Sequence, residues 1–287
     1  MITTFLQWAK LYSVIVYPEK AYIIFRFLFG IYFVYYFVRS FPYVVSVYSN
    51  EGMLRFFEFN WTYGMFPNFL YVFDSPAVVM ATIFVGIVFA VLFSLGFVPR
   101  VSAFFLWYIQ TALFNRNNLT GDPSIAYVGL LLLILALLPQ VRPLTKYFLS
   151  KKDIAKEIVV PFYVFYVPVF IFCLTFTMSA LDKVNAVSWR NGEAFRLILN
   201  LPIAKEWFLV SYLRESMYIT PLLSYLALVA QFICLPLFIL GWYRVALVIN
   251  LFSFIFVYMT LELNQVSVGM IFFFVFFLLR DFNRKLT

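Results

Sequence analysis

The chain has 287 residues, of which 64% are apolar and 12% are charged, and it carries a formal net charge of +8. Soluble domains are about 45–50% apolar and about 25% charged, so this composition excludes a soluble globular protein and indicates an integral membrane protein. The sequence contains no histidine and only two cysteines, Cys173 and Cys234. These counts exclude histidine catalysis and a disulfide framework, and we expect no metal site.

The N-terminal segment, residues 1–20, includes the stretch ITTFLQWAKLYSVIVY. Thr3, Gln7 and Lys10 share one face of a helix, and hydrophobic side chains occupy another. The pattern predicts an amphipathic helix in the membrane interface, with an ordinary first turn of the membrane domain as the alternative. The segment lacks the basic start and the small-residue cleavage site of a signal peptide.

The rest of the chain is dominated by long apolar segments. A bilayer core about 30 Å thick needs about 20 apolar residues per helix. The sequence therefore predicts an all-α polytopic membrane protein, a single transmembrane domain over residues 1–287, with about eight transmembrane helices. The predicted spans are 21–38, 76–95, 99–115, 124–139, 159–180, 221–240, 245–261 and 265–279.

The connections between these spans differ in length and charge. Two long ones, 39–75 and 181–220, carry balanced charge, whereas the loop 140–158 is basic. The positive-inside rule then places the N- and C-termini in the cytoplasm, the basic loop inside and the two long loops outside. We expect a bacterial inner or plasma membrane and contact with membrane lipid. The excess positive charge is a topology signal and gives no reason to expect nucleic acid as a partner.

Two short connections, LGFVPRVSAFF and LGWYRVALVI, resemble each other. Each places a glycine before an arginine, Arg100 in the first and Arg244 in the second. The similarity suggests a four-plus-four internal repeat, with chance similarity between apolar hairpins as the alternative.

Polar residues cluster in LFNRNNLTGDPSIAY, residues 113–127. Arg116, Asn117, Asn118 and Asp122 provide amide groups and an Arg–Asp pair that can bind a polar head group or position a reacting carbonyl. The alternative is a capped turn, because Asp122 precedes a Pro-Ser pair at the start of the next predicted helix.

A second candidate site lies in TMSALDKVNAVSWRNGEAFRLILN, where Asp182 and Lys183 follow the fifth predicted span. Adjacent residues on a helix point about 100° apart, so the two do not pair. Desolvation favours the neutral amine of a lysine, which is a competent general base. The alternative is a lysine that extends to the headgroups. A third candidate is Arg26, several residues inside the first span, where a basic group needs a polar partner.

The runs AYIIFRFLFGIYF, GFVPRVSAFFLWYIQTALFNRNNLTGDPSIAY and SALDKVNAVSWRNGEAFRLILNLP occur in this order. Together they resemble the HTTM superfamily, the membrane domain shared by vitamin K-dependent gamma-carboxylases and SdpB-type proteins of bacterial toxin maturation. The resemblance implies that Lys183 is the base that deprotonates a hydroquinone, with Trp189 and Gly192 as its motif neighbours. It also maps the asparagine-rich loop of the family onto Asn117 and Asn118.

The chain departs from the carboxylases in two respects: they carry a histidine beside that loop and a large lumenal domain. These departures argue against glutamate carboxylation itself. One hypothesis is an enzyme that uses a quinone or hydroquinone, with Lys183, Asn117 and Asn118 as catalytic residues and Arg116, Asp122, Trp189 and Arg26 binding the quinol. A second is an SdpB-type protein for the maturation or export of a small secreted peptide, acting with a soluble partner protein. A third, a transporter, is disfavoured because no span shows a Gly/Pro-interrupted, charge-lined midplane site.

Overall fold

The computed structural model describes residues 14–56, 58, 60, 62–139, 143–144 and 157–279. The chain groups into two units, Val14–Val160, here called the N-terminal unit, and Pro161–Thr287 with Met1–Ser13, here called the C-terminal unit. The sequence had suggested one domain. The division falls after the basic loop 140–158, most of which lies outside the described residues.

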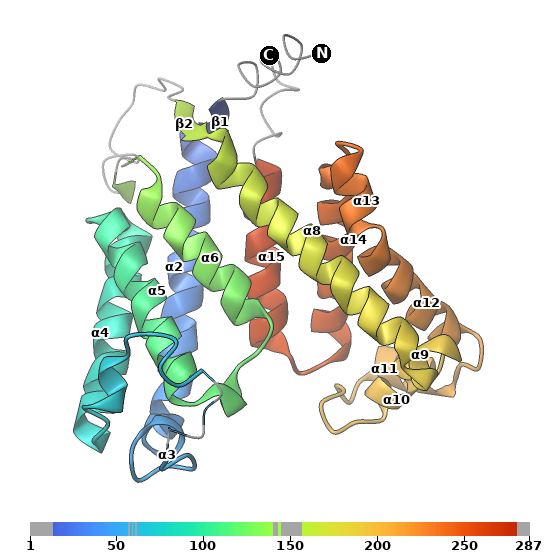
Figure 1. The fold of residues 1–287 in the computed structure, drawn as a ribbon, viewed down its shortest axis with the longest axis horizontal. Helices are drawn as coiled ribbons and strands as arrows, with labels where there is room; N and C mark the ends of the chain where they lie inside the picture. Colours follow the sequence, from blue (N-terminus) through green and yellow to red (C-terminus); the bar gives the residue numbers. More distant parts are fainter. Residues whose placement is uncertain are drawn as a thin grey trace. The chain divides into compact units, whose positions relative to one another are not determined.

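The N-terminal unit is built around four longer helices that pack in chain order, α2 on α4, α4 on α5 and α5 on α6. Its two strands, β1 and β2, pair in a two-stranded sheet (Figure 1). The elements are β1 (Val14–Pro18), α2 (Glu19–Ser40), η1 (Phe41–Tyr43), α3 (Val44–Tyr48), η3 (Phe69–Tyr71), α4 (Pro76–Leu95), α5 (Pro99–Arg116), η4 (Asn118–Thr120), α6 (Ser124–Leu137) and β2 (Glu157–Pro161).

The strand β1 differs from the interfacial helix expected over residues 1–20. Residues 1–13 lie outside the described part of the chain, but Val14–Pro18 is a strand, so the helix prediction is wrong there. Three β-branched residues in a row favour an extended backbone once a partner strand is present. That partner, β2, lies far along the chain and also takes up the start of the span predicted at 159–180.

The C-terminal unit contains the long helices α8 and α14 and a helix that is broken into α12 and α13. Both parts of the broken helix pack on α8, and α14 packs on α15. The elements are α8 (Phe162–Asn185), α9 (Val187–Arg190), α10 (Ala194–Leu199), α11 (Phe208–Glu215), α12 (Ile219–Phe232), α13 (Cys234–Ile239), α14 (Tyr243–Thr260) and α15 (Asn264–Leu278).

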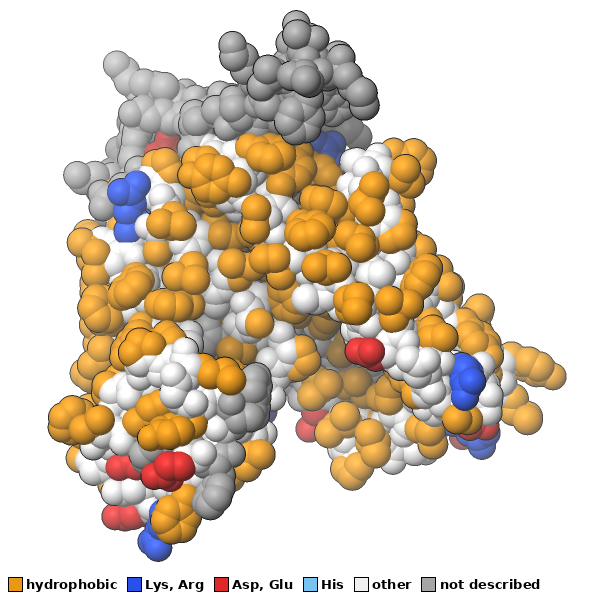
Figure 2. Space-filling model, viewed as in Figure 1, with side chains coloured by type: hydrophobic (Ala, Val, Ile, Leu, Met, Phe, Trp, Pro, Cys, Tyr) orange, Lys and Arg blue, Asp and Glu red, His pale blue; other side chains and the backbone are white. Residues whose placement is uncertain are grey.

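The helices are those of an integral membrane protein. Among the described residues, five helical segments are long and apolar enough to cross a bilayer: Glu19–Tyr48, Pro76–Leu95, Phe162–Asn185, Ile219–Ile239 and Tyr243–Thr260. Figure 2 shows hydrophobic side chains over the helices and charged side chains near the helix ends. Large apolar side chains such as Phe84 and Phe252 are more than 60% exposed, which water would penalise and lipid accommodates. The prediction of an all-α membrane protein is confirmed at this level.

The two short connections with similar sequences also have similar backbones. Gly96 and Gly241 both adopt the left-handed conformation, with φ of 81° and 79°. In each turn the residue after the glycine donates its backbone N–H to the carbonyl oxygen five residues earlier, Phe97 to Leu92 (2.9 Å) and Trp242 to Leu237 (2.7 Å). This is the Schellman motif, in which glycine ends a helix without steric strain.

Candidate functional site

Lys183 lies in the last turn of α8, two residues before the helix ends, and not beyond it as the sequence suggested. Its ammonium group donates to the side-chain oxygen of Gln231 at 2.6 Å and lies 5.3 Å from the centroid of the Trp189 ring. In the described part of the chain, no carboxylate pairs with it. Its side chain is also half-buried, so water hydrates the ammonium group only in part.

The segment after Lys183 is attached to α12 by backbone contacts. The hydroxyl of Ser224 accepts from the N–H of Phe195 and donates to the carbonyl oxygen of Gly192, each at 3.0 Å. Gly192 has φ of 75°, and a Cβ there would lie 2.9 Å from the Cβ of Pro221, so the turn requires glycine. These contacts hold Trp189 against the end of α8.

Gln231 stands where the α12–α13 helix breaks. Pro236 has no N–H to donate to the carbonyl of Phe232, which would leave that carbonyl without its helical partner. Thr177 on α8 compensates: its hydroxyl contacts the Phe232 carbonyl oxygen at 3.3 Å and accepts from the Leu235 N–H at 3.0 Å. These Thr177 contacts hold the C-terminal end of α12 against α8, and this end carries Gln231, which lies beside Lys183.

Arg116 is fully buried at the C-terminal end of α5. It donates to the carbonyl oxygens of Leu54 (2.7 Å) and Ser49 (3.1 Å) and forms an ion pair with Asp74 (3.1 Å). The acid in this pair comes from the long connection before α4 and not from the 113–127 stretch. Arg116 thereby fastens the connection 49–74 to the end of α5.

Asparagine side chains complete this attachment. Asn117 is fully buried, its amide nitrogen donates to the carbonyl of Val47 at 2.8 Å, and its amide oxygen accepts from the N–H of Leu119 at 3.1 Å. Asn118 is half-buried, and its amide nitrogen has no hydrogen-bond partner among the described residues. Arg116 and Asn117 are therefore engaged with backbone groups, while Asn118 retains a donor.

Two further asparagines, Asn60 and Asn68, were not among the candidate site residues identified from the sequence. Asn60 donates to the carbonyl oxygens of Asn115 and Arg116, both at 2.9 Å, and Asn68 donates to that of Ala112 at 2.8 Å. The last carbonyls of a helix lack intrahelical partners. Buried asparagines in a long connection are a signal of such capping, but the sequence does not say which helix they reach.

Arg26 lies elsewhere in the N-terminal unit, under the turn between α4 and α5. It is fully buried, and a Cβ on Gly96 would lie 2.1 Å from its guanidinium nitrogen. Gly96 lies three residues before the start of α5, whereas Arg116 ends that helix, and an 18-residue helix is about 27 Å long at 1.5 Å per residue. Arg26 therefore does not share a site with Arg116.

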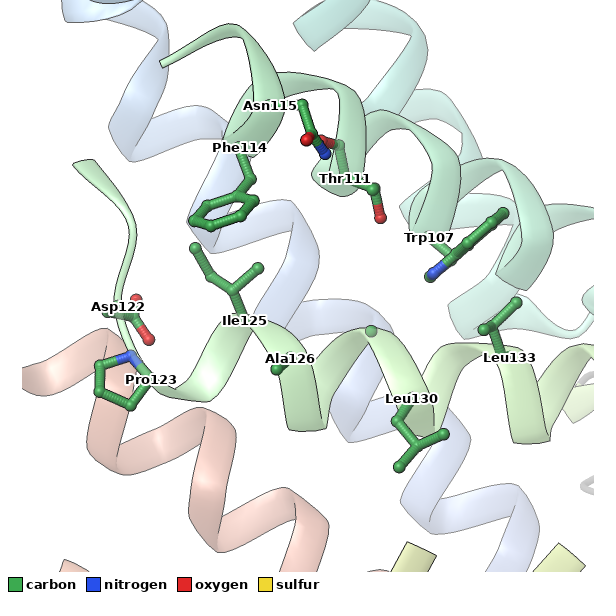
Figure 3. A pocket seen from close by; sticks show the side chains of 11 residues that line it. Trp107, Thr111, Phe114, Asn115, Asp122, Pro123, Ile125, Ala126, Leu130 and Leu133 are labelled. Carbon is green, nitrogen blue, oxygen red and sulfur yellow. The ribbon is translucent and has the colours of Figure 1, made fainter. Parts of the chain in front are cut away.

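Asp122 has two roles in the structure. One carboxylate oxygen accepts from the backbone N–H of Ser124 at 2.7 Å and from the Ser124 hydroxyl, which matches the capped-turn interpretation. Asp122 also lines a pocket of about 480 Å³ between α5 and α6 (Figure 3). Trp107, Thr111 and Asn115 line the same pocket from α5.

The candidate residues thus form separate groups. Lys183 and Trp189 meet in the C-terminal unit, whereas Arg116, Asn117 and Asp122 belong to the N-terminal unit. In the described residues no group of three or more histidine, cysteine or acidic side chains is arranged to hold a metal ion. No protein-family model, curated protein or solved structure matches the chain.

Proposed function

We propose that this integral membrane protein is a quinol-using enzyme of the HTTM type, with Lys183 as the base that takes a proton from a quinol hydroxyl. The observation that carries the proposal is the surroundings of Lys183, which meets an amide oxygen and an aromatic face and, among the described residues, no carboxylate. A base must be the neutral amine, and a carboxylate partner would hold the amine in its charged form.

The proposed reaction needs an electron acceptor, and dissolved oxygen suffices for an assay. Lys183 removes one quinol proton, and the quinolate then gives two electrons and its second proton to O2. Protonated Lys183 returns the first proton to the peroxide, so that quinol and O2 become quinone and hydrogen peroxide. Trp189 flanks the ring, because Lys183 lies 5.3 Å from the centroid of its indole. Arg116, Asn117 and Arg26, which the resemblance or the sequence had assigned to chemistry or quinol binding, have structural roles in this proposal.

The test is oxygen-dependent quinol oxidation by purified protein in nanodiscs. Lys183→Met removes the amine and is expected to lower the rate by about 10²–10⁴-fold, the usual contribution of a general base. Lys183→Arg keeps a cation over Trp189 but supplies no base, so it should be equally slow. Lys205→Met is the matched control, because Lys205 also lies over an aromatic ring, that of Tyr258 at 4.4 Å. Full activity in Lys183→Met would refute the assignment.

The eight-span topology is part of the proposal. The shorter helices α5, α6 and α15 pack on longer apolar neighbours of their own units, which supports their crossing the bilayer as well. With cytoplasmic termini in a bacterial inner membrane, Lys183 then faces the outer side. The two Schellman turns, one in each unit, support the four-plus-four repeat. Reporter fusions after residues 98, 200 and 242 test this topology, and an outer location for residue 242 would contradict it.

A second candidate function is that of an SdpB-type protein that matures or exports a secreted peptide with a soluble partner. One observation favours it: between α8 and α12, large side chains are strongly exposed on a segment outside the five candidate spans, namely those of Phe208, Tyr212, Met217 and Tyr218. A photo-crosslinker at Tyr212 tests this in the native host. Crosslinks to a secreted peptide would support it, and a crosslinker that captures only lipid would argue against it.

A further inference from the structure

A line of polar side chains runs along the side of α5 that faces α6. Trp107, Thr111 and Asn115 are spaced four residues apart, so on a helix they lie on one face at intervals of about 6 Å. Figure 3 shows the indole nitrogen of Trp107 and the hydroxyl oxygen of Thr111 turned toward the pocket between the two helices. This face is the polar wall of an otherwise apolar groove.

The polar atoms of this wall are not fully satisfied by the protein. The Asn115 amide nitrogen donates to the carbonyl of Thr111 at 2.8 Å, which leaves its amide oxygen as an acceptor. The Trp107 indole N–H and the Thr111 hydroxyl make no hydrogen bond with any other described residue. Polar groups that face hydrocarbon without a partner cost several kcal/mol each, so a ligand that supplies partners gains from binding here.

The charge of Asp122 at one end of the groove indicates which kind of polar headgroup a ligand there would carry. Asp122 is the ionisable residue in the lining, and in the described part of the chain no lysine or arginine pairs with it. Tyr32, Tyr36 and Tyr48 lie within its electrostatic reach, but phenols do not neutralise a carboxylate. A carboxylate without a basic partner favours a positively charged headgroup and disfavours a carboxylate or phosphate.

The other wall suits a hydrocarbon chain. Ile125, Ala126, Gly129, Leu130 and Leu133 line it from α6, and the absence of a side chain at Gly129 leaves room for the Trp107 indole, which a Cβ there would meet at 3.5 Å. A volume of about 480 Å³ lies within the usual range for small-ligand pockets, roughly 300–1,000 Å³.

We propose that the α5–α6 groove binds a single-chain amphipath with a protonated amine headgroup. The ammonium group lies against Asp122, the polar wall of α5 offers partners for further polar atoms of the ligand, and the chain follows the apolar wall of α6. This site goes beyond the proposed enzyme: it lies wholly in the N-terminal unit and requires no turnover. Its test therefore works equally well in the Lys183→Met protein.

The experiment uses a long-chain alkylamine brominated on its chain, titrated into protein in nanodiscs of zwitterionic lipid. Bromine quenches nearby indole fluorescence, and the saturable quenching that disappears in Trp107→Phe reports occupancy of the groove. We expect the amine to half-saturate the site at a concentration at least tenfold below that of the brominated alcohol or fatty acid of the same length. Equal half-saturation for the three headgroups, or quenching that never saturates, overturns the proposal.

Two variants sharpen the result. Asp122→Asn removes the charge but keeps an acceptor for the Ser124 N–H, so α6 retains its cap and the preference for the amine should disappear. Ala126→Phe fills the groove and should abolish saturable quenching. Ala81→Phe is the matched control, because Ala81 is also an exposed alanine on a helix, α4, but does not line the pocket. An unchanged amine preference in Asp122→Asn, or saturable quenching in Ala126→Phe equal to that in the control, contradicts the assignment.

Discussion

Replacing Arg116 with methionine separates a structural role from a chemical one. Arg116 is fully buried and makes contacts of 2.7, 3.1 and 3.1 Å with two carbonyls and with Asp74. Removing one partner of a buried ion pair costs about 3–5 kcal/mol, because the other charge is left uncompensated. The side chain of Asp74 is 16% exposed and regains some hydration, so the expected loss is near the lower end, about 3 kcal/mol.

The assay is thermal unfolding in detergent, followed by circular dichroism. For a chain of this size, 1 kcal/mol shifts Tm by about 2–4 °C, so Arg116→Met should lower Tm by about 6–12 °C. Asp74→Asn should lower it less, because an amide oxygen still accepts from the guanidinium. The two changes should not add in the double variant, since they break the same pair.

An exposed ion pair supplies the control. Arg214 and Glu206 are 3.0 Å apart, close to the distance in the buried pair, but the side chain of Glu206 is 78% exposed. Water screens such a pair, so Glu206→Gln should lower Tm near pH 7 by much less than Arg116→Met does. If Arg116→Met loses quinol oxidation while its Tm equals that of the wild type, the structural role of Arg116 is wrong and the quinol-binding role predicted from the sequence is favoured instead.

Three other predictions concern single contacts. Gly96→Ala should destabilise the protein strongly, because the new methyl group meets the buried guanidinium of Arg26. Gly241 has a similar φ but open space around it, so Gly241→Ala should cost only the left-handed backbone penalty of about 1–2 kcal/mol. Comparing the Tm values of the two variants checks this. Asn68→Ala removes a buried hydrogen bond to the Ala112 carbonyl near the end of α5 and should cost about 1–3 kcal/mol in thermal unfolding, and an unchanged Tm would contradict this role. Arg214 lowers the pKa of Glu206, so their pair stabilises the fold above the ordinary glutamate pKa and loses that contribution as pH falls through the lowered value. Glu206→Gln should therefore flatten the acid side of the Tm–pH curve. A curve identical to that of the wild type would count against the pair.

The membrane character of the chain and most of its helices follow from local sequence. Apolar segments such as 76–95 are long enough to cross a bilayer, and helix α4 spans the same residues. The segment 14–18 was misassigned because its extended backbone depends on β2, more than a hundred residues further along the chain. Local periodicity carries no information about such a partner.

The candidate residues were harder to interpret than the helices. The sequence identified Arg116 and Asn117 as polar groups near the membrane, but their partners Ser49, Asp74 and Val47 lie 42 to 70 residues away. Buried polar groups need hydrogen-bond partners in any protein, so their presence alone does not separate structure from chemistry. The contact of Asp122 with Ser124, by contrast, is local, so the capped turn could be proposed from the sequence as an alternative to quinol binding.

The helix break at Pro236 links the position of α13 to the surroundings of Lys183. Thr177 and Lys183 stand on α8 less than two turns apart, and both contact the last residues of α12: the hydroxyl meets backbone, and the ammonium meets Gln231. A change in the bend between α12 and α13 therefore displaces the amide oxygen that holds the lysine. If Lys183 is the proposed base, mechanical strain on this span, from bilayer thickness or from a neighbouring molecule, would change the hydrogen bond to its amine.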